Sequence, residues 1–149
     1  AAATGSRPAT AKHAREAERA LLRKVGLNPA NYRLADGSGL SLYNYLSAEA
    51  EVKLLRYAYQ NENIFHHLYQ ALPIAGVDGT LKKRMRSTFT RNNVRAKTGT
   101  LTGISSLAGY CKAANGHWLS FAIINQGVMH ARNAKNFQNR VCTILCAPN

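Results

Sequence analysis

The sequence predicts an α+β fold, in which helices and an antiparallel sheet occupy separate stretches of the chain. Apolar residues recur at helical spacing through the first half, and three strand-like segments follow between residues 94 and 125. A helical pattern then returns near the C-terminus. The length of 149 residues fits one domain or a piece of one.

The N-terminal third predicts one helix followed by turns. Residues 1–9 are rich in Ala, Thr, Gly, Ser and Pro, so we expect a disordered or cut N-terminus there. Residues 10–25 predict a helix that Gly26 ends. A short strand is expected at residues 32–34, and the run at residues 36–39 predicts a tight turn. The apolar face of the helix repeats every three or four residues: Ala14, Ala17, Leu21 and Val25.

Two helices and a basic segment are expected in the middle of the chain. Residues 47–60 and residues 61–72 each carry apolar side chains at helical spacing. A glycine-punctuated loop follows the second helix. After it, residues 81–86 predict a short basic helix, with Asp78 or Thr80 as its N-cap.

The last third predicts a three-stranded meander and a helix. Strands are expected at residues 94–98, 105–113 and 118–125, with a hairpin signal at residues 114–116. Residues 131–145 predict the closing helix. Its expected apolar face consists of Ala134, Phe137, Val141 and Leu145 or Ile144.

Charge restricts the classes of partner. The chain has 20 Lys+Arg against 7 Asp+Glu, a net charge of +13, which favours polyanions such as nucleic acid, cell-wall polymer or an acidic membrane surface. The basic residues are spread out without a nucleic-acid-binding motif, so we expect solvated surface charge and no nucleic acid partner. No apolar run of about 18 residues predicts a membrane span, and the Ala-rich start lacks the apolar core of a signal peptide.

The cysteines do not predict a metal site. Cys142 and Cys146 are four residues apart, so they would share one face of a helix, but no histidine lies at a completing spacing. Buried thiols are the favoured interpretation for these two residues and for Cys111. We therefore expect no metal.

The stretch around Lys97 is the main candidate site. Residues 94–98 alternate as a strand would, and Gly99 is expected to interrupt them. A lysine ammonium, the hydroxyls of Thr98 and Thr100, and bare backbone together suit a bound carboxylate or a developing oxyanion. The alternative is an edge strand that a lysine protects, with Gly99 as a bulge.

Four blocks together resemble a known enzyme family. They are DGSGLS at residues 36–41, LPIAGVDGTL at residues 72–81, KTG at residues 97–99 and GISSLAGY at residues 103–110. Their order and spacing resemble the C-terminal part of the D-alanyl-D-alanine carboxypeptidase/endopeptidase family, the class C low-molecular-mass penicillin-binding proteins (peptidase family S13). The resemblance implies that residues 10–149 are the C-terminal portion of a penicillin-binding, transpeptidase-like domain.

The resemblance also implies roles for individual residues. Lys97 and Thr100 are expected to be catalytic: the lysine supplies positive potential, and the Thr100 amide donates to the oxyanion. The carboxylate of a peptidoglycan stem peptide or a β-lactam would be held at the same strand. The residues expected to bind substrate are Thr98, Gly99, Thr100, Thr102, Ser41 and Leu42. Leu42 stands where relatives often carry an arginine.

Two geometric expectations follow from this assignment. We expect Lys97 on an edge-proximal strand, with its side chain partly exposed in a groove. We also expect Ser41 to lie close to Thr98 in space. No cofactor is expected, because acyl transfer by a serine needs none.

Two of the family's three catalytic motifs are absent from the chain. No serine here is followed by lysine at the third position, and no Ser-x-Asn occurs before the KTG block. In the family, both motifs precede the DGSGLS block. We therefore expect a fragment that is inactive alone, with the N-terminal remainder of the enzyme as its partner and the periplasm or cell envelope as its location. The competing interpretations are a non-catalytic carboxylate-binding module and a basic polyanion-binding protein on the same scaffold.

Overall fold

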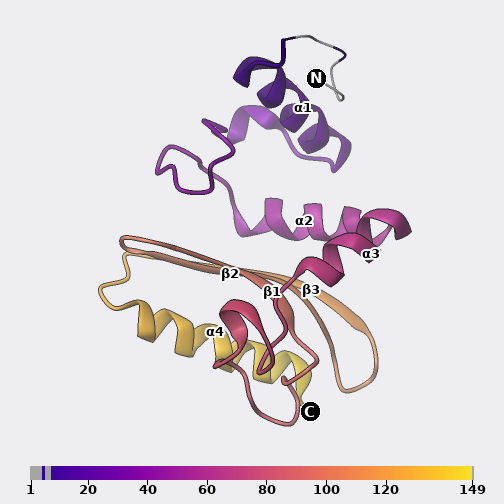
Figure 1. The fold of residues 1–149 in the computed structure, drawn as a ribbon, viewed down its shortest axis with the longest axis vertical. Helices are drawn as coiled ribbons and strands as arrows, with labels where there is room; N and C mark the ends of the chain where they lie inside the picture. Colours follow the sequence, from indigo (N-terminus) through magenta and orange to yellow (C-terminus); the bar gives the residue numbers. More distant parts are fainter. Residues whose placement is uncertain (1–4, 6–7, 149) are drawn as a thin grey trace. The chain divides into compact units, whose positions relative to one another are not determined.

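The computed structural model describes residue 5 and residues 8–148 of the chain (Figure 1). Most of the predicted disordered or cut N-terminus, residues 1–9, lies outside the described residues. The chain divides into two compact units, Ala1–Leu54 and Leu55–Asn149. Helices and antiparallel strands occupy separate stretches, which confirms the predicted α+β class.

The first unit is built on α1 (Ala11–Lys24). The predicted apolar face of this helix is only partly right: Val25 packs against the core of the unit, but Leu22 is 3% exposed whereas the expected Leu21 is 38% exposed. Leu22 packs with Leu27, from the turn after the helix, and with Ala50. The small core of this unit therefore depends on the turn that follows α1.

The segment after α1 is mostly irregular. The predicted strand at residues 32–34 is reduced to a single antiparallel bridge between Arg33 and Tyr45, which follows the 3-10 turn η1 (Pro29–Asn31). Helix α2 (Ala48–Tyr59) begins in this unit and continues into the second. Ser47 caps its start, because the Ser47 hydroxyl accepts a hydrogen bond from the Ala50 amide at 3.1 Å.

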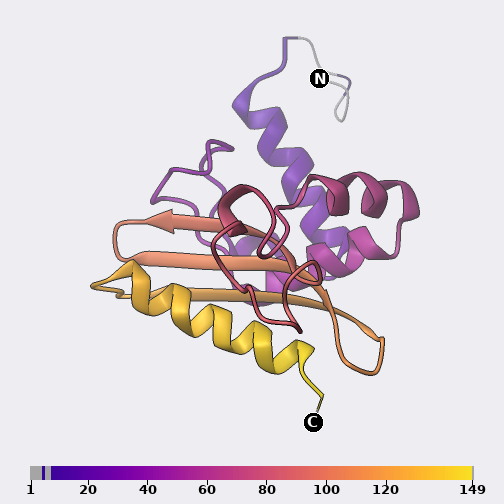
Figure 2. The same cartoon turned by 60° about the horizontal axis from the view of Figure 1, so that its bottom comes forward.

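An antiparallel sheet forms the centre of the second unit. Its strands are β1 (Arg95–Leu101), β2 (Ile104–Lys112) and β3 (Trp118–Gln126), in the order β1-β2-β3. Helix α4 (Ala131–Cys146) runs along one face of the sheet (Figures 1 and 2). The core between them contains Val94, Ala96, Leu107, Cys111, Phe121, Cys142 and Cys146.

The predicted apolar face of α4 is only partly right, because Ala134 is buried and Leu145 packs against the core while two other members are exposed. Phe137 is 52% exposed and Ile144 is 72% exposed. The residues that α4 buries are instead four apart: Ala134, Gln138, Cys142 and Cys146. A polar side chain takes the central place in this stripe, because it finds hydrogen-bond partners inside the protein.

The predicted short helix at residues 81–86 is not formed. The loop before β1 contains only the 3-10 turn η2 (Gly79–Leu81). Met85 then adopts a left-handed backbone conformation with φ of 51°, which cannot continue a right-handed helix. This reversal places the Met85 side chain in the core, where it is 6% exposed.

Aromatic side chains cover the sheet face opposite α4. Helix α3 (Glu62–Ala71) contributes Phe65 and Tyr69, which contact Tyr110 of β2 and Trp118 of β3 at centroid distances of 5.2–6.2 Å. The sheet is thus covered on both faces by side chains of the second unit. Within the described residues, no helix combines the length and apolar composition needed to cross a membrane.

Candidate functional site

The residues Lys97, Thr98 and Gly99 lie on β1, at the edge of the described sheet. This position confirms that Lys97 lies on an edge strand, whereas the expected groove around its side chain stays a prediction. The expectation that Gly99 interrupts the strand is wrong, because β1 continues through it in register with Ser106 and without a bulge. A Cβ atom at position 99 would collide with the Ser106 hydroxyl, so the glycine keeps the pairing regular.

The outer edge of β1 is covered in its first half by the preceding loop. The amide of Ala96 donates to the carbonyl of Pro73 at 3.1 Å, so its backbone groups point away from β2. Alternate residues of an antiparallel strand direct their backbone groups to opposite sides. Thr98 and Thr100 therefore also direct their amides and carbonyls to the outer edge, beyond the contact with Pro73. An extended ligand could pair with the strand there.

A positive charge lies directly over this edge. Lys97 is exposed, and its Nζ donates to the carbonyl of Thr98 at 2.6 Å. The neighbouring Val94 and Ala96 are fully buried, so the lysine is held on a rigid strand. A fixed ammonium beside outward backbone amides is a suitable environment for a carboxylate.

Hydroxyl groups complete the cluster. The Thr98 hydroxyl donates to the hydroxyl of Thr80 at 3.1 Å. Thr100 is exposed, and Thr102 lies exposed in the turn that joins β1 to β2. The strand thus brings together an ammonium, two hydroxyls and two outward amides. These groups can bind an anion, but they do not include an activated nucleophile.

The predicted residues Ser41 and Leu42 belong to the first unit. There, Asp36 Oδ1 accepts hydrogen bonds from the amide and the hydroxyl of Ser38, at 2.9 and 2.7 Å. These bonds lower the pKa of Asp36. The Asp36–Ser38 bonds close the predicted tight turn at residues 36–39, and the Ser41 hydroxyl accepts from the Tyr43 amide at 3.2 Å. The approach of Ser41 to Thr98 stays a prediction.

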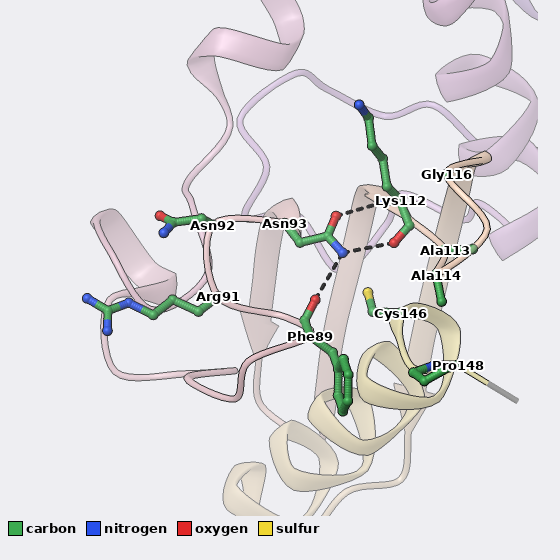
Figure 3. Close-up of a pocket in the computed structure, with 10 residues that line it drawn as sticks. All are labelled: Phe89, Arg91, Asn92, Asn93, Lys112, Ala113, Ala114, Gly116, Cys146 and Pro148. Atoms are coloured by element: carbon green, nitrogen blue, oxygen red, sulfur yellow. Dashed lines mark hydrogen bonds between the residues drawn. The ribbon is translucent and has the colours of Figure 1, made fainter.

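A separate hollow of about 610 Å³ lies at the other end of β1 (Figure 3). Asn93 spans it by donating to the carbonyls of Phe89 and Lys112, at 2.9 and 2.8 Å. Figure 3 shows the charged ends of Arg91 and Lys112 directed away from the sulfur of Cys146. Because this hollow has no convergent charges and no exposed nucleophile among its lining residues, it is a weaker candidate for a binding or catalytic site than the edge of β1.

The thiols do not add a reactive site. All three cysteines are buried and unpaired: Cys111, Cys142 and Cys146. Burial raises the pKa of Cys142 to about 12, which keeps it a neutral thiol at physiological pH. Among the residues that the structure describes, no group of three or more His, Cys, Asp or Glu side chains could hold a metal ion.

The structure gives two residues contacts that the sequence did not predict. Thr80 was expected only as a possible helix cap, yet its hydroxyl contacts Thr98. Arg84 was expected to carry solvated charge in the basic segment at residues 81–86, yet it donates to Gln138 at 2.9 Å and to Asn139 at 3.0 Å. The LPIAGVDGTL block contains Thr80, so the block pattern was the available signal for the first of them.

Known proteins provide an independent comparison. The family model described as D-Ala-D-Ala carboxypeptidase 3 (S13) matches residues 1–147. The chain is 40% identical over 117 residues to D-alanyl-D-alanine carboxypeptidase DacB of Haemophilus influenzae. The matched region covers 77% of this chain and 24% of that protein. It is 41% identical over 109 residues to a D-alanyl-D-alanine carboxypeptidase of Actinomadura. That matched region covers 69% of this chain and 20% of the Actinomadura protein.

The fold agrees with the sequence comparison. The crystal structure of penicillin-binding protein 4 from Haemophilus influenzae, complexed with a β-lactam, superposes with a TM-score of 0.83 at 33% identity. The match covers 95% of this chain and 35% of that one. The chain therefore spans about a quarter or less of the two curated relatives, at 24% and 20% of their lengths.

Proposed function

Because the chain belongs to the D-Ala-D-Ala carboxypeptidase 3 (S13) family, we propose that it forms the carboxylate-binding part of a serine-type D-Ala-D-Ala carboxypeptidase or endopeptidase. The substrates would be the stem peptides of peptidoglycan. The observation that carries the proposal is the open edge of β1, where Lys97, Thr98 and Thr100 combine a charge, hydroxyls and outward amides.

These groups would act on two parts of the substrate, its terminal carboxylate and its scissile carbonyl. The hydroxyls of Thr98 and Thr100 would donate to the terminal carboxylate of a D-alanyl-D-alanine peptide, and the Lys97 ammonium would balance its charge. The outward amide of Thr100 would donate to the oxygen of the scissile carbonyl. Such a donor is worth roughly 3 kcal/mol when negative charge develops on that oxygen.

The reaction is acyl transfer through a serine. The serine Oγ would attack the carbonyl carbon of the penultimate residue, and the C–N bond would break as the terminal D-alanine leaves with a proton on its amine. Water would then hydrolyse the ester and regenerate the serine. None of these steps requires a cofactor.

The serine would come from outside the 149 residues. None of the serines of this chain has a lysine three residues later. The two curated relatives are much longer, since the match to this chain covers only 24% and 20% of them. We propose that a preceding segment supplies the Ser-x-x-Lys and Ser-x-Asn motifs. The chain alone would then be inactive. A peptidoglycan substrate would place the enzyme in the periplasm or cell envelope.

The β-lactam in the solved relative supports one further part of the proposal. That protein, penicillin-binding protein 4 of Haemophilus influenzae, was solved with a β-lactam bound. A β-lactam carries a carboxylate and a strained amide, so it resembles the terminal dipeptide in the groups that β1 would contact. We propose β-lactams as covalent inhibitors of the longer protein.

A non-catalytic binding module is the second candidate. It is favoured by the absence of an activated serine within the chain and by the net charge of +13. In that case the edge of β1 would bind carboxylates or polyanions, and no bond would break.

Release of D-alanine separates the two candidates. The longer protein, with the preceding segment, is incubated with a peptide that ends in D-Ala-D-Ala and with the same peptide ending in D-Ala-L-Ala. We expect release of the terminal alanine from the first peptide only, and no release from either peptide when the serine of the Ser-x-x-Lys motif is changed to Ala. Binding of both peptides without release would favour the module and overturn the enzyme.

A further inference from the structure

The side chain of Thr98 is held by a residue from another part of the chain. Its hydroxyl donates to the hydroxyl of Thr80 at 3.1 Å across a sequence separation of 18 residues. We propose that Thr80 is a positioning residue, whose hydroxyl orients that of Thr98 toward the terminal carboxylate of the substrate. This inference rests on the proposed function and adds a determinant of specificity for the free carboxylate.

The loop that carries Thr80 is internally fixed. Asp78 Oδ1 accepts from the amide of Ile74 at 2.6 Å, and the amide of Gly76 donates to the carbonyl of Leu81 at 3.0 Å. Gly79 has a φ of 49°, and a Cβ there would lie 3.1 Å from the ring of Pro73. The backbone on either side of Thr80 is therefore tightly constrained.

The loop is also anchored to the core of the second unit. Leu81 is fully buried directly after Thr80, and Met85 is buried a few residues later. Between them, Arg84 donates to the side chain of Gln138 on α4 at 2.9 Å. The amide of Ala75 donates to the carbonyl of Val94 at 2.9 Å, which ties the start of the loop to the start of β1. A loop held at both ends presents the Thr80 hydroxyl at a defined position.

The two hydroxyls can exchange donor and acceptor roles. In the free chain, Thr98 donates to Thr80. A hydroxyl has one donor and two acceptor positions, so Thr80 can rotate and donate to Thr98 Oγ1 instead. The proton of Thr98 is then released from Thr80 and directed at a carboxylate oxygen. Without Thr80, the free hydroxyl must be ordered by the ligand itself, which costs conformational entropy.

The backbone of Thr98 is fixed from the other side. Its carbonyl accepts a hydrogen bond from Lys97 Nζ at 2.6 Å. Thr98 is thus restrained at its carbonyl by Lys97 and at its hydroxyl by Thr80. Of these two restraints, only the one from Thr80 acts on the hydroxyl that would meet the carboxylate.

The test compares Thr80→Val with Thr80→Ser in the longer protein that the proposed function requires. Valine keeps the shape of threonine and removes the hydroxyl, whereas serine keeps the hydroxyl. Hydrolysis is followed for a peptide ending in D-Ala-D-Ala with a free carboxylate and for its C-terminal amide. Thr88→Val is the matched control, because Thr88 is an exposed threonine of the same unit.

We expect Thr80→Val to raise KM for the carboxylate peptide roughly five- to tenfold, the effect of one lost hydrogen bond. The amide peptide should change less than about twofold, while Thr80→Ser and Thr88→Val should resemble the unmodified protein. Equal losses on both peptides would show a merely structural role and overturn the inference. The inference would also be overturned if the unmodified protein cleaves the carboxylate peptide and Thr80→Val leaves its KM unchanged. If the unmodified protein cleaves neither peptide, the proposed function fails and the inference fails with it.

Discussion

The guanidinium of Arg84 donates a hydrogen bond to the side-chain oxygen of Gln138 at 2.9 Å. Gln138 is fully buried on α4, and its amide nitrogen donates to Ser105 at 3.2 Å and to Asn125 at 3.0 Å. One side chain thus joins the loop before β1, the last helix and two strands. Since the same loop carries Thr80, this network contributes to the order of the candidate site.

Replacing Gln138 with Met tests the network. Methionine has a similar volume but cannot accept from Arg84 or donate to Ser105 and Asn125. We expect the free energy of unfolding to fall by about 2–3 kcal/mol, because buried polar groups lose their partners. Urea unfolding of the variant gives this value. The control Gln126→Met, at the exposed end of β3, should change stability by less than about 0.5 kcal/mol, and an equal effect of both substitutions would contradict the explanation.

This network also explains why the sequence placed Phe137, and not Gln138, on the buried face of α4. Apolar spacing favoured Phe137, yet the helix is turned so that Gln138 faces the core. A glutamine is normally counted as polar surface, and its burial depends on an arginine 54 residues away. The existence and type of α4 were predictable from local pattern, whereas its orientation depended on a tertiary hydrogen bond.

The candidate site shows the same division. Lys97, Thr98, Gly99 and Thr100 are consecutive, so a strand assignment alone brings them to one edge. Thr80 is 18 residues from Thr98, and no local pattern predicts their contact. The short helix expected at residues 81–86, directly after Thr80, is not formed. The left-handed backbone of Met85 prevents it, and helical propensity does not predict that conformation.

Gly109 is predicted to be required for the pairing of β1 with β2. A Cβ at this position would lie 2.6 Å from the Cα of Ala96 and would collide with the carbonyl oxygen of Arg95. We expect Gly109→Ala to lower the free energy of unfolding by about 3 kcal/mol or more, because backbone atoms must move to relieve the overlap. Gly37→Ala is the control, since open space surrounds that position and its φ is not left-handed. Thermal unfolding that leaves Gly109→Ala as stable as the control would refute the close approach.

Tyr110 is predicted to make the fold sensitive to alkaline pH. Its side chain is 1% exposed and its hydroxyl donates to the carbonyl of Leu55 at 2.6 Å. Burial raises the pKa of Tyr110 to about 12, above the unfolded value near 10. The stabilising contribution is therefore complete below about pH 10 and is lost as the pH rises toward 12.

The measurement compares the unfolding free energy of the parent chain and Tyr110→Phe across this range. We expect the parent chain to lose up to about 2–3 kcal/mol more than the variant between pH 10 and pH 12. Because the buried thiol of Cys142 also has a raised pKa, the difference between the two proteins is the relevant quantity. Parallel curves for the two proteins would show that Tyr110 does not cause the pH dependence.

Lys97 is predicted to accelerate acylation in the longer protein. The change Lys97→Ala removes the ammonium from the edge of β1 while leaving the strand in place. We expect the rate of acylation by a penicillin to fall by roughly two to three decades, as for other contacts that stabilise developing negative charge. Lys112→Ala, an exposed lysine on the neighbouring strand, should leave the rate within about twofold. Equal rates for the two variants would remove Lys97 from the catalytic assignment.

The source of the nucleophile is tested most directly by intact-mass spectrometry after incubation with a penicillin. The 149-residue chain should show no covalent adduct, because it lacks a serine with an adjacent lysine base. The longer protein with the preceding segment should gain the mass of one penicillin, and lose this adduct when the serine of its Ser-x-x-Lys motif is changed to Ala. A stoichiometric adduct on the 149-residue chain, or no adduct on the longer protein, would contradict the account.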